Sequence, residues 1–284
     1  MGWIFGNGSY EFLQFPMDAR NLSLYNSASA YNGSFLSNNP ASLSTRTKSK
    51  TYSYFYLPAN IHYTGYQKIQ KSQFGIKSHQ VSFMSYGAIK DSETEENSYA
   101  YDLLIKSGYK REIKDLTSIG ISGGYLLSSI AGYKSQLIFS NIGIRSRILR
   151  KKLGVGFSIE NIGFIIKSYT EVKEKVPTLY RTAIYYEPRY IPLVINGDFV
   201  KYLDEEDLFY IFGAIEFKPN SCLTLRLGAS SNRNGFLTGD FTSDVIAGLS
   251  GGAGFLFNNM ILDIGLMNLG PAGFVMGFSV NKNM

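Results

Sequence analysis

The residues that most often carry out catalysis are few and widely spaced in this chain. Cys222 is the single cysteine, so no intramolecular disulfide can form, and a buried or lipid-facing thiol is expected there rather than a nucleophile. The two histidines, His62 and His79, lie in segments with a strand pattern and are too few for a zinc site without many carboxylate partners. Ser128-Ser129 has no nearby histidine to act as its base. The sequence therefore predicts no enzymatic activity, no catalytic residue, no metal site and no cofactor.

Two glycine-rich stretches invite comparison with phosphate-binding loops. Residues 120–124 are Gly-Ile-Ser-Gly-Gly, and residues 248–254 are Gly-Leu-Ser-Gly-Gly-Ala-Gly. A phosphate-binding loop joins a strand to a helix, because its backbone N–H groups and the helix N-terminus hold the phosphate. Neither stretch matches that motif or joins a strand pattern to a helix pattern. Glycines on the inner face of a curved strand explain both stretches better.

Charged residues cluster at only a few places. The net charge is +6, and the densest basic group is Arg145, Arg147, Arg150, Lys151 and Lys152, which falls between two strand patterns. The group is short and the other lysines are scattered, so a solvated turn is preferred over a nucleic-acid surface. We expect no nucleic-acid partner.

Acidic residues form one strong run, residues 204–207 (Asp-Glu-Glu-Asp), and a weaker group at Glu93, Glu95 and Glu96. Such a run could bind Ca²⁺ in a surface loop, because hard cations prefer several carboxylate oxygens. A solvated turn between strands is the preferred interpretation of both groups.

The elements that would position these groups are strands. Charged residues make up 18% of the 284 residues, which is low for a soluble domain, and aromatic residues make up 15%. No stretch approaches the roughly 20 apolar residues that a membrane helix needs. The mean hydropathy of −0.06 is nevertheless compatible with a membrane β-barrel, because a barrel strand needs an apolar residue only at every second position.

Period-two alternation dominates from Lys48 onward. In residues 153–159, Leu, Val, Phe and Ile share one face, and Gly, Gly and Ser share the other. Successive side chains of a strand point to opposite faces, so each such segment has one apolar face and one small or polar face. Breaks at regular intervals divide the pattern into about fourteen strands, near residues 48–58, 60–70, 74–87, 97–109, 116–128, 132–146, 149–163, 178–188, 191–203, 207–218, 222–231, 243–257, 259–268 and 272–281.

The strand count and the connections favour a transmembrane barrel. Fourteen is an even number, as in bacterial single-chain barrels, and most segments have the ~9–11 residues needed to cross a bilayer at a tilt. Some junctions are short, such as 218–220 and 257–259, and others are longer and polar, such as 168–177 and 232–243. Tyr and Phe cluster near strand ends, where a headgroup-level girdle is expected, although aromatic residues are also good strand formers. We predict an all-β, antiparallel transmembrane barrel.

Residues 1–47 differ from the rest of the chain. They are rich in Asn, Ser and Ala and show little alternation. Residues 16–30 could contain a short helix, and Asn-Asn-Pro-Ala at 38–41 predicts a turn. Residues 1–5 have neither the charged leader nor the apolar core of a signal peptide, so either a mature chain or a missing start is expected for an exported protein. A soluble or periplasmic β-protein is therefore one alternative.

An ordered series of short motifs also runs through the chain. Residues 10–20 (YEFLQFPMDAR) are followed by Leu22, Leu24 and the turn 39–43 (NPASL). This opening resembles that of the PorV/PorQ family, in which Y-x-F-L-x-x-P-x-x-A-R leads to N-P-A-x-L before the first strand. Further matches, closest to PorQ, are Val81 to Gly87, Ser128 to Ser135, Glu160 to Gly163 with Lys167 and Tyr169, Val176-Pro177, Gly197-Asp198 and Met267 to Gly273.

The resemblance spans nearly the whole chain and implies a FadL-like barrel of fourteen strands. Residues 1–47 would enter or plug the lumen, and residues 48–284 would form the barrel as one structural unit. Asp18, Arg20, Asn39 and Pro40 are the candidates for fixing the plug. We expect Arg20 to pair with a carboxylate inside the barrel, because a charge held away from water needs a partner.

The resemblance also implies a role in type IX secretion at the bacterial outer membrane. PorV-type barrels receive and shuttle secreted cargo, and PorQ-type barrels act in the surface-attachment complex. The expected partners are outer-membrane lipid and other secretion proteins or cargo. The FadL-like fold gives an alternative from another class, a transporter of hydrophobic small molecules with a hydrophobic ligand in a partly filled lumen.

Overall fold

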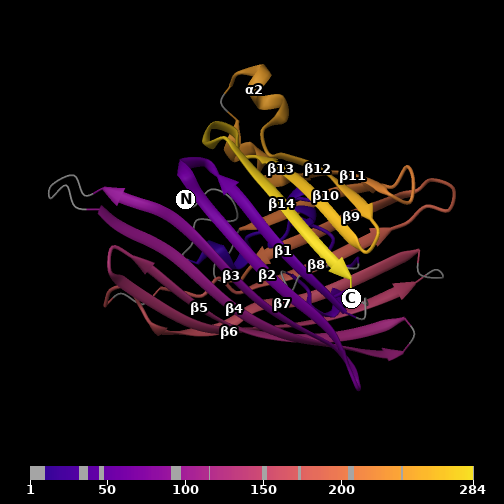
Figure 1. Cartoon of the computed structure of the whole chain (residues 1–284), viewed down its shortest axis with the longest axis horizontal. Helices are drawn as coiled ribbons and strands as arrows, with labels where there is room; N and C mark the ends of the chain where they lie inside the picture. Colours follow the sequence, from indigo (N-terminus) through magenta and orange to yellow (C-terminus); the bar gives the residue numbers. More distant parts are fainter. Residues whose placement is uncertain are drawn as a thin grey trace.

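The structure of the chain is a closed antiparallel β-barrel (Figure 1). The computed structural model describes residues 10–31, 38–44, 48–90, 97–114, 116–148, 152–171, 174–203, 208–237 and 239–283. Within these ranges every strand pairs with its neighbour in sequence, and β1 pairs with β14 to close the ring. The strands are β1 (Lys48–Leu57), β2 (Ile61–Ser72), β3 (Gly75–Lys90), β4 (Asn97–Lys114), β5 (Thr117–Ile130), β6 (Tyr133–Ile148), β7 (Leu153–Lys167), β8 (Leu179–Tyr186), β9 (Leu193–Tyr202), β10 (Phe209–Phe217), β11 (Leu223–Ser230), β12 (Leu249–Phe257), β13 (Met260–Asn268) and β14 (Phe274–Asn283). The predicted fourteen-stranded architecture is confirmed.

The apolar face of each strand lies on the outside of the barrel. On β14, Phe274, Met276 and Phe278 are 46%, 44% and 51% exposed, whereas Val275 and Ser279 are buried. The other strands repeat this arrangement, so large apolar side chains form a band around the exterior. A soluble barrel would bury these side chains, whereas hydrocarbon solvates them. The barrel is therefore a transmembrane one, which argues against the soluble alternative.

The connections differ in length between the two ends of the barrel. Those at the end where β1 begins and β14 finishes are short, such as 73–74 and 258–259. The longest, 168–178 and 231–248, lie at the opposite end. Because short turns face the periplasm in outer-membrane barrels, we call the two ends the periplasmic rim and the extracellular rim.

One predicted strand begins later than its pattern indicated. Residues 243–257 were expected to form a single strand, but β12 begins at Leu249 and is preceded by the helix α2 (Phe241–Ile246). The apolar residues Val245 and Ile246 are adjacent, so the alternation that a strand requires breaks there. A turn with Gly248 at φ 69° then separates the helix from the strand. The rest of the 231–248 connection contains η5 (Ser231–Phe236), and η3 (Pro58–Asn60) and η6 (Gly270–Ala272) lie in two other extracellular turns.

Two residues of the basic group at 145–152 lie in a strand and not in the solvated turn that was expected. Arg145 and Arg147 belong to β6, which extends to Ile148. Both occupy inward positions, and Arg145 is buried with its guanidinium carbon 6.0 Å from the centre of the Tyr185 ring. Arg150 and Lys151 lie outside the described residues, as do the acidic groups at 93–96 and 204–207.

The N-terminal segment, defined here as residues 10–31 and 38–44, lies within the ring of strands (indigo in Figure 1). It contains η1 (Glu11–Gln14), α1 (Ala19–Ser23) and η2 (Pro40–Ser42). α1 is the short helix expected within 16–30, and η2 is the turn expected at 38–41. Its apolar side chains are buried together with inward-facing side chains of the strands. No helix in the described ranges is long and apolar enough to span a membrane.

Candidate functional site

The inward faces of three adjacent strands carry opposite charges that meet at Arg181 on β8. Arg181 is 2% exposed, and its Nε lies 3.0 Å from Glu160 Oε1 on β7. Its Nη1 lies 3.4 Å from Asp198 Oδ2 on β9. The register places both carboxylates diagonally across from Arg181 on the same face of the sheet. The guanidinium thus has a carboxylate on either side, which offsets the cost of burying its charge.

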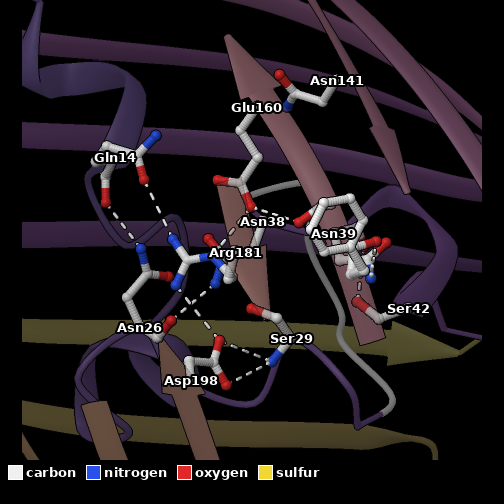
Figure 2. Close-up of polar contacts among 12 residues, drawn as sticks. Gln14, Asn26, Ser29, Asn38, Asn39, Ser42, Asn141, Glu160, Arg181 and Asp198 are labelled. Carbon is white, nitrogen blue, oxygen red and sulfur yellow. Dashed lines mark hydrogen bonds and ion pairs between the residues drawn. The ribbon is translucent and has the colours of Figure 1, made fainter. Parts of the chain in front are cut away.

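This cluster also binds the N-terminal segment (Figure 2). Arg181 Nη2 donates a hydrogen bond to Gln14 Oε1 at 3.3 Å. Asp198 Oδ1 accepts hydrogen bonds from the backbone N–H groups of Ala28 at 3.1 Å and Ser29 at 3.4 Å. The charges of β7, β8 and β9 therefore hold the segment at two points, before and after α1.

A second charged cluster joins α1 to the next part of the wall, on β10 (adjacent to β9), β11 and β13. Arg20 donates to Glu216 from Nη2 at 2.6 Å and from Nε at 3.1 Å. Glu216 also accepts from Arg226 Nε at 3.1 Å, and Arg226 Nη1 reaches Asp263 Oδ1 at 2.7 Å. This result confirms the prediction that Arg20 pairs with a carboxylate inside the barrel. The Glu216 carboxylate holds the pKa of Arg20 above its ordinary value, even though burial favours the neutral form.

A glycine makes the contact between Arg226 and Asp263 possible. Arg226 lies on β11 and Asp263 on β13, so the ion pair has to pass over β12. The inward position of β12 at that level is Gly254, where an added Cβ would lie 2.5 Å from Asp263 Oδ1. The glycine-rich stretch 248–254 therefore leaves room for an ion pair that crosses three strands.

Asn39 and Pro40 fasten the later part of the segment to β5, β6 and β7. Asn39 Nδ2 donates to the backbone oxygen of Ile144 at 3.0 Å, and Asn39 Oδ1 accepts from the N–H of Ala41 at 2.9 Å. Pro40 begins η2 and lies directly against Gly120, where an added Cβ would come within 2.3 Å of the Pro40 carbonyl carbon. Gly120 thus permits the close approach of two backbones.

Asp18 acts within the segment itself. Its carboxylate accepts a hydrogen bond at 2.6 Å from the backbone N–H of Asn21 and so caps the N-terminus of α1. The first N–H of the helix, that of Ala19, donates to Ser279 Oγ on β14 at 2.7 Å. The four residues predicted to fix the plug all lie inside the barrel, and three of them, Arg20, Asn39 and Pro40, contact its wall. That these four residues keep the N-terminal segment in place stays a prediction.

The lumen near the extracellular rim is apolar. Phe12 and Phe15 of the segment pack against Tyr63 of β2, with ring centres 6.1 Å and 5.5 Å apart. Phe15 also packs against Phe55 of β1 at 5.7 Å. The Tyr63 hydroxyl donates to the backbone oxygen of Met17 at 3.2 Å, which satisfies its polar end. The segment therefore fills an aromatic part of the lumen.

The 168–178 connection folds inward over this apolar region. The Tyr169 hydroxyl donates to Ser128 Oγ, which in turn donates to Asp102. Tyr86 donates to the other oxygen of Asp102 at 2.5 Å, and Val176 is buried in the same apolar core. The extracellular entrance is thus covered by the connection as well as by the segment.

A cavity of about 360 Å³ opens at the periplasmic rim. Its inner wall carries the Arg20 cluster, and Tyr31, Lys218 and Cys222 lie around it. Lys218 Nζ lies 5.5 Å from the centre of the Tyr31 ring. The expectation that Cys222 is buried or lipid-facing is wrong, because β11 begins one residue later and leaves the exposed thiol in the turn. In the described part of the chain, no group of three or more His, Cys, Asp or Glu side chains could hold a metal ion.

The sequence analysis missed most of the charged clusters. The missed residues are Glu160, Arg181, Asp198, Glu216, Arg226 and Asp263. Each is a charged residue on the inward face of its strand, where the inward neighbours include apolar residues such as Leu179 and Phe212. That position was the available signal, because a charge facing the interior of a barrel requires a partner.

Comparison with known proteins gives likeness of fold only. No protein-family model and no curated protein sequence matches the chain. Similar solved structures include the toluene transporter TodX of Pseudomonas putida, at 10% identity and a TM-score of 0.62, over 95% of this chain and 98% of TodX. The monoaromatic hydrocarbon channel CymD has 10% identity and a TM-score of 0.66, over 95% and 98%. The toluene transporter TbuX of Ralstonia pickettii has 10% identity and a TM-score of 0.61, over 96% and 99%.

These comparisons and the geometry define the class of the protein. The apolar exterior, the closed ring of strands and the short periplasmic turns are those of a bacterial outer-membrane β-barrel. The predicted FadL-like fold and the outer-membrane location are confirmed.

Proposed function

We propose that the barrel is a channel for small hydrophobic molecules across the outer membrane, and that the N-terminal segment closes it in this structure. The observation that carries the proposal is the apolar lining of the lumen toward the extracellular rim. The inward-facing, buried side chains there are Phe55, Leu57, Ile61, Tyr63, Met84, Leu104, Leu126, Leu137, Phe139, Leu179, Val200, Phe212, Met267 and Val275.

Such a lining suits hydrocarbon better than water. Barrels that conduct hydrophilic solutes have a polar interior. Here Phe12, Phe15 and Met17 occupy the apolar part of the lumen, and they would leave it open to another apolar molecule if the segment moved. The N-terminal segment is held in the lumen both by this apolar packing and by its polar contacts with the wall, so opening of the channel requires release of both.

The fold neighbours support this choice. TodX and TbuX are described as toluene transporters, and CymD as a monoaromatic hydrocarbon channel. Toluene is therefore a reasonable first probe. Cells that express the barrel in a strain with low background uptake should accumulate labelled toluene several times faster than cells carrying an empty vector. Equal rates in the two strains would contradict the proposal, provided that the folded barrel is present in the outer membrane.

A second candidate is a protein-interaction role in type IX secretion, as a member of the PorV/PorQ family. The ordered motif series from residue 10 to residue 273 favours it. A barrel whose lumen is filled by the N-terminal segment can still bind other proteins at its two rims. Deletion of the gene should then abolish secretion or surface attachment of cargo with a C-terminal sorting signal. Normal secretion together with reduced toluene uptake would favour the channel.

A further inference from the structure

Three lysines stand side by side on the outer surface of the barrel at the periplasmic rim. Lys50 on β1 pairs directly with Lys282 on β14 and with Lys68 on β2. All three occupy the outward face, because they continue the rows of exposed Tyr52 and Phe278 on their strands. Side chains at directly paired positions start about 4.5–5.5 Å apart, so the three ammonium groups can converge on one ligand. We call these residues the lysine row.

Within the part of the chain that the structure describes, the lysine row lacks a counter-charge. Like charges at directly paired positions repel each other. The five adjacent strands β13, β14, β1, β2 and β3 contain a single carboxylate, Asp263, which points inward to Arg226. Among the described residues, none of the three ammonium groups has a partner within ion-pair distance. Repulsion among the three ammonium groups therefore destabilises the protein, and an anion bound from outside would relieve it.

The position of the row relative to the membrane identifies that anion. Toward the middle of the barrel the next outward residues are Tyr52 and Tyr66, whose rings are 5.0 Å apart. Outward-facing tyrosines of a barrel are enriched at the level of the lipid headgroups. The lysine row lies just beyond them on the side of the short turns, and so at the headgroups of the periplasmic leaflet.

We propose that the lysine row binds the phosphate of an anionic phospholipid in the periplasmic leaflet. The acyl chains would then lie along the apolar outer face of β14, which carries Met276, Phe278 and Val280, and against the neighbouring tyrosines of β1. Lysine stems can lie on this apolar surface while their ammonium groups reach the phosphate. A protein partner is less well supported, since it would have to displace lipid from a wall that is apolar immediately beside the row.

Native mass spectrometry of the intact barrel in detergent tests this site, with dioleoylphosphatidylglycerol and dioleoylphosphatidylcholine as probes. The wild-type protein should bind the phosphatidylglycerol more tightly. The triple variant Lys50→Gln, Lys68→Gln, Lys282→Gln should bind it on the order of tenfold or more weakly, because each lysine near a membrane surface is worth about a fivefold change in affinity. Binding of phosphatidylcholine should not change.

The triple variant Lys134→Gln, Lys175→Gln, Lys201→Gln is the matched control. It removes the same charge near the extracellular rim, and it should bind phosphatidylglycerol like the wild type. Heat-dependent mobility on a detergent gel reports whether each variant is folded. If the first variant does not fold, addition of about 0.5 M NaCl to the wild type should still weaken phosphatidylglycerol binding, since salt screens such contacts.

Three results would overturn the proposal. One is equal affinity of the wild type for the two lipids. Another is equal loss of phosphatidylglycerol binding in the two triple variants. The third is unchanged lipid binding in the lysine-row variant together with loss of an acidic periplasmic protein that co-purifies with the wild type, which would assign the row to a protein.

Discussion

Arg20 and Glu216 are separated by 196 positions in the sequence and form a two-point ion pair inside the barrel. The pair joins the helix of the N-terminal segment to strand β10. Glu216 is 2% exposed and is shared with Arg226, so one carboxylate balances two guanidinium groups together with Asp263. This shared carboxylate therefore links α1 to β10 and β11 beside the periplasmic cavity.

Replacement of Glu216 by glutamine should weaken the barrel. The variant leaves Arg20 without its partner and Arg226 with Asp263 alone. Loss of one partner of a buried ion pair typically costs 3–5 kcal/mol, and we expect about 3 kcal/mol here because Arg20 borders the periplasmic cavity. Unfolding by guanidinium in detergent, followed by circular dichroism, measures the loss.

Glu171→Gln is the control for this variant. Glu171 is exposed in the extracellular 168–178 connection and should tolerate the same change within about 0.5 kcal/mol. Equal stability of Glu216→Gln and the wild type would mean that the Arg20 contact does not hold the segment.

The barrel itself could be predicted from the sequence, but its interior contacts could not. Alternation fixes which side of a strand each residue faces, so the two faces of residues 153–159 were predicted correctly: Val155 and Phe157 are exposed and Ser158 is buried. Alternation does not say which part of residues 10–44 lies at a given height in the lumen. The contact between Arg181 and Gln14 depends on that placement and spans 167 positions. The position of residues 1–47 was expected from a family resemblance, because their composition has no period.

The helix α2 shows a second limit. The segment before β12 contains Val245 and Ile246, two strand-forming residues, and so was joined to the strand. Its Asp244 accepts a hydrogen bond from the N–H of Gly239 at 2.9 Å, a local contact that favours the helical turn. Strand propensity averaged over several neighbouring residues does not take account of such a side-chain contact.

Gly120→Ala should displace η2 from the wall. An added Cβ at Gly120 would lie 2.3 Å from the carbonyl carbon of Pro40, a backbone atom that cannot rotate away. We expect a loss of about 1–3 kcal/mol in the free energy of unfolding, the usual cost of overpacking. Gly213→Ala is the comparison, since no atom lies within 4 Å of an added Cβ there. If both variants are as stable as the wild type, the contact between β5 and Pro40 is not close in solution.

The free energy of unfolding should fall as the pH rises, because Glu11 in η1 of the N-terminal segment loses its proton. Burial raises the pKa of Glu11 from 4.5 to about 8. A raised pKa means that the folded protein favours the protonated carboxyl, so the contribution to stability is complete below pH 4.5 and is lost as the pH passes about 8. The wild type should therefore lose more stability than Glu11→Gln between these two pH values. Equal losses in the two proteins would show that Glu11 titrates normally.

In the proposed function the N-terminal segment closes an apolar passage, and a disulfide that locks the segment to the wall tests this closure most directly. Ala30 of the N-terminal segment and Gly156 of β7 can be replaced by cysteines in a Cys222→Ser background. A Cβ at Gly156 would lie 3.4 Å from the Ala30 Cα, with Asn39 Nδ2 nearest to it at 3.1 Å, so the pair can reach disulfide geometry with a small shift and no backbone clash. Toluene uptake by cells carrying this protein is then measured before and after reduction. We predict background uptake in the oxidised form and wild-type uptake in the reduced form. Equal uptake well above background in both forms would contradict closure by the segment.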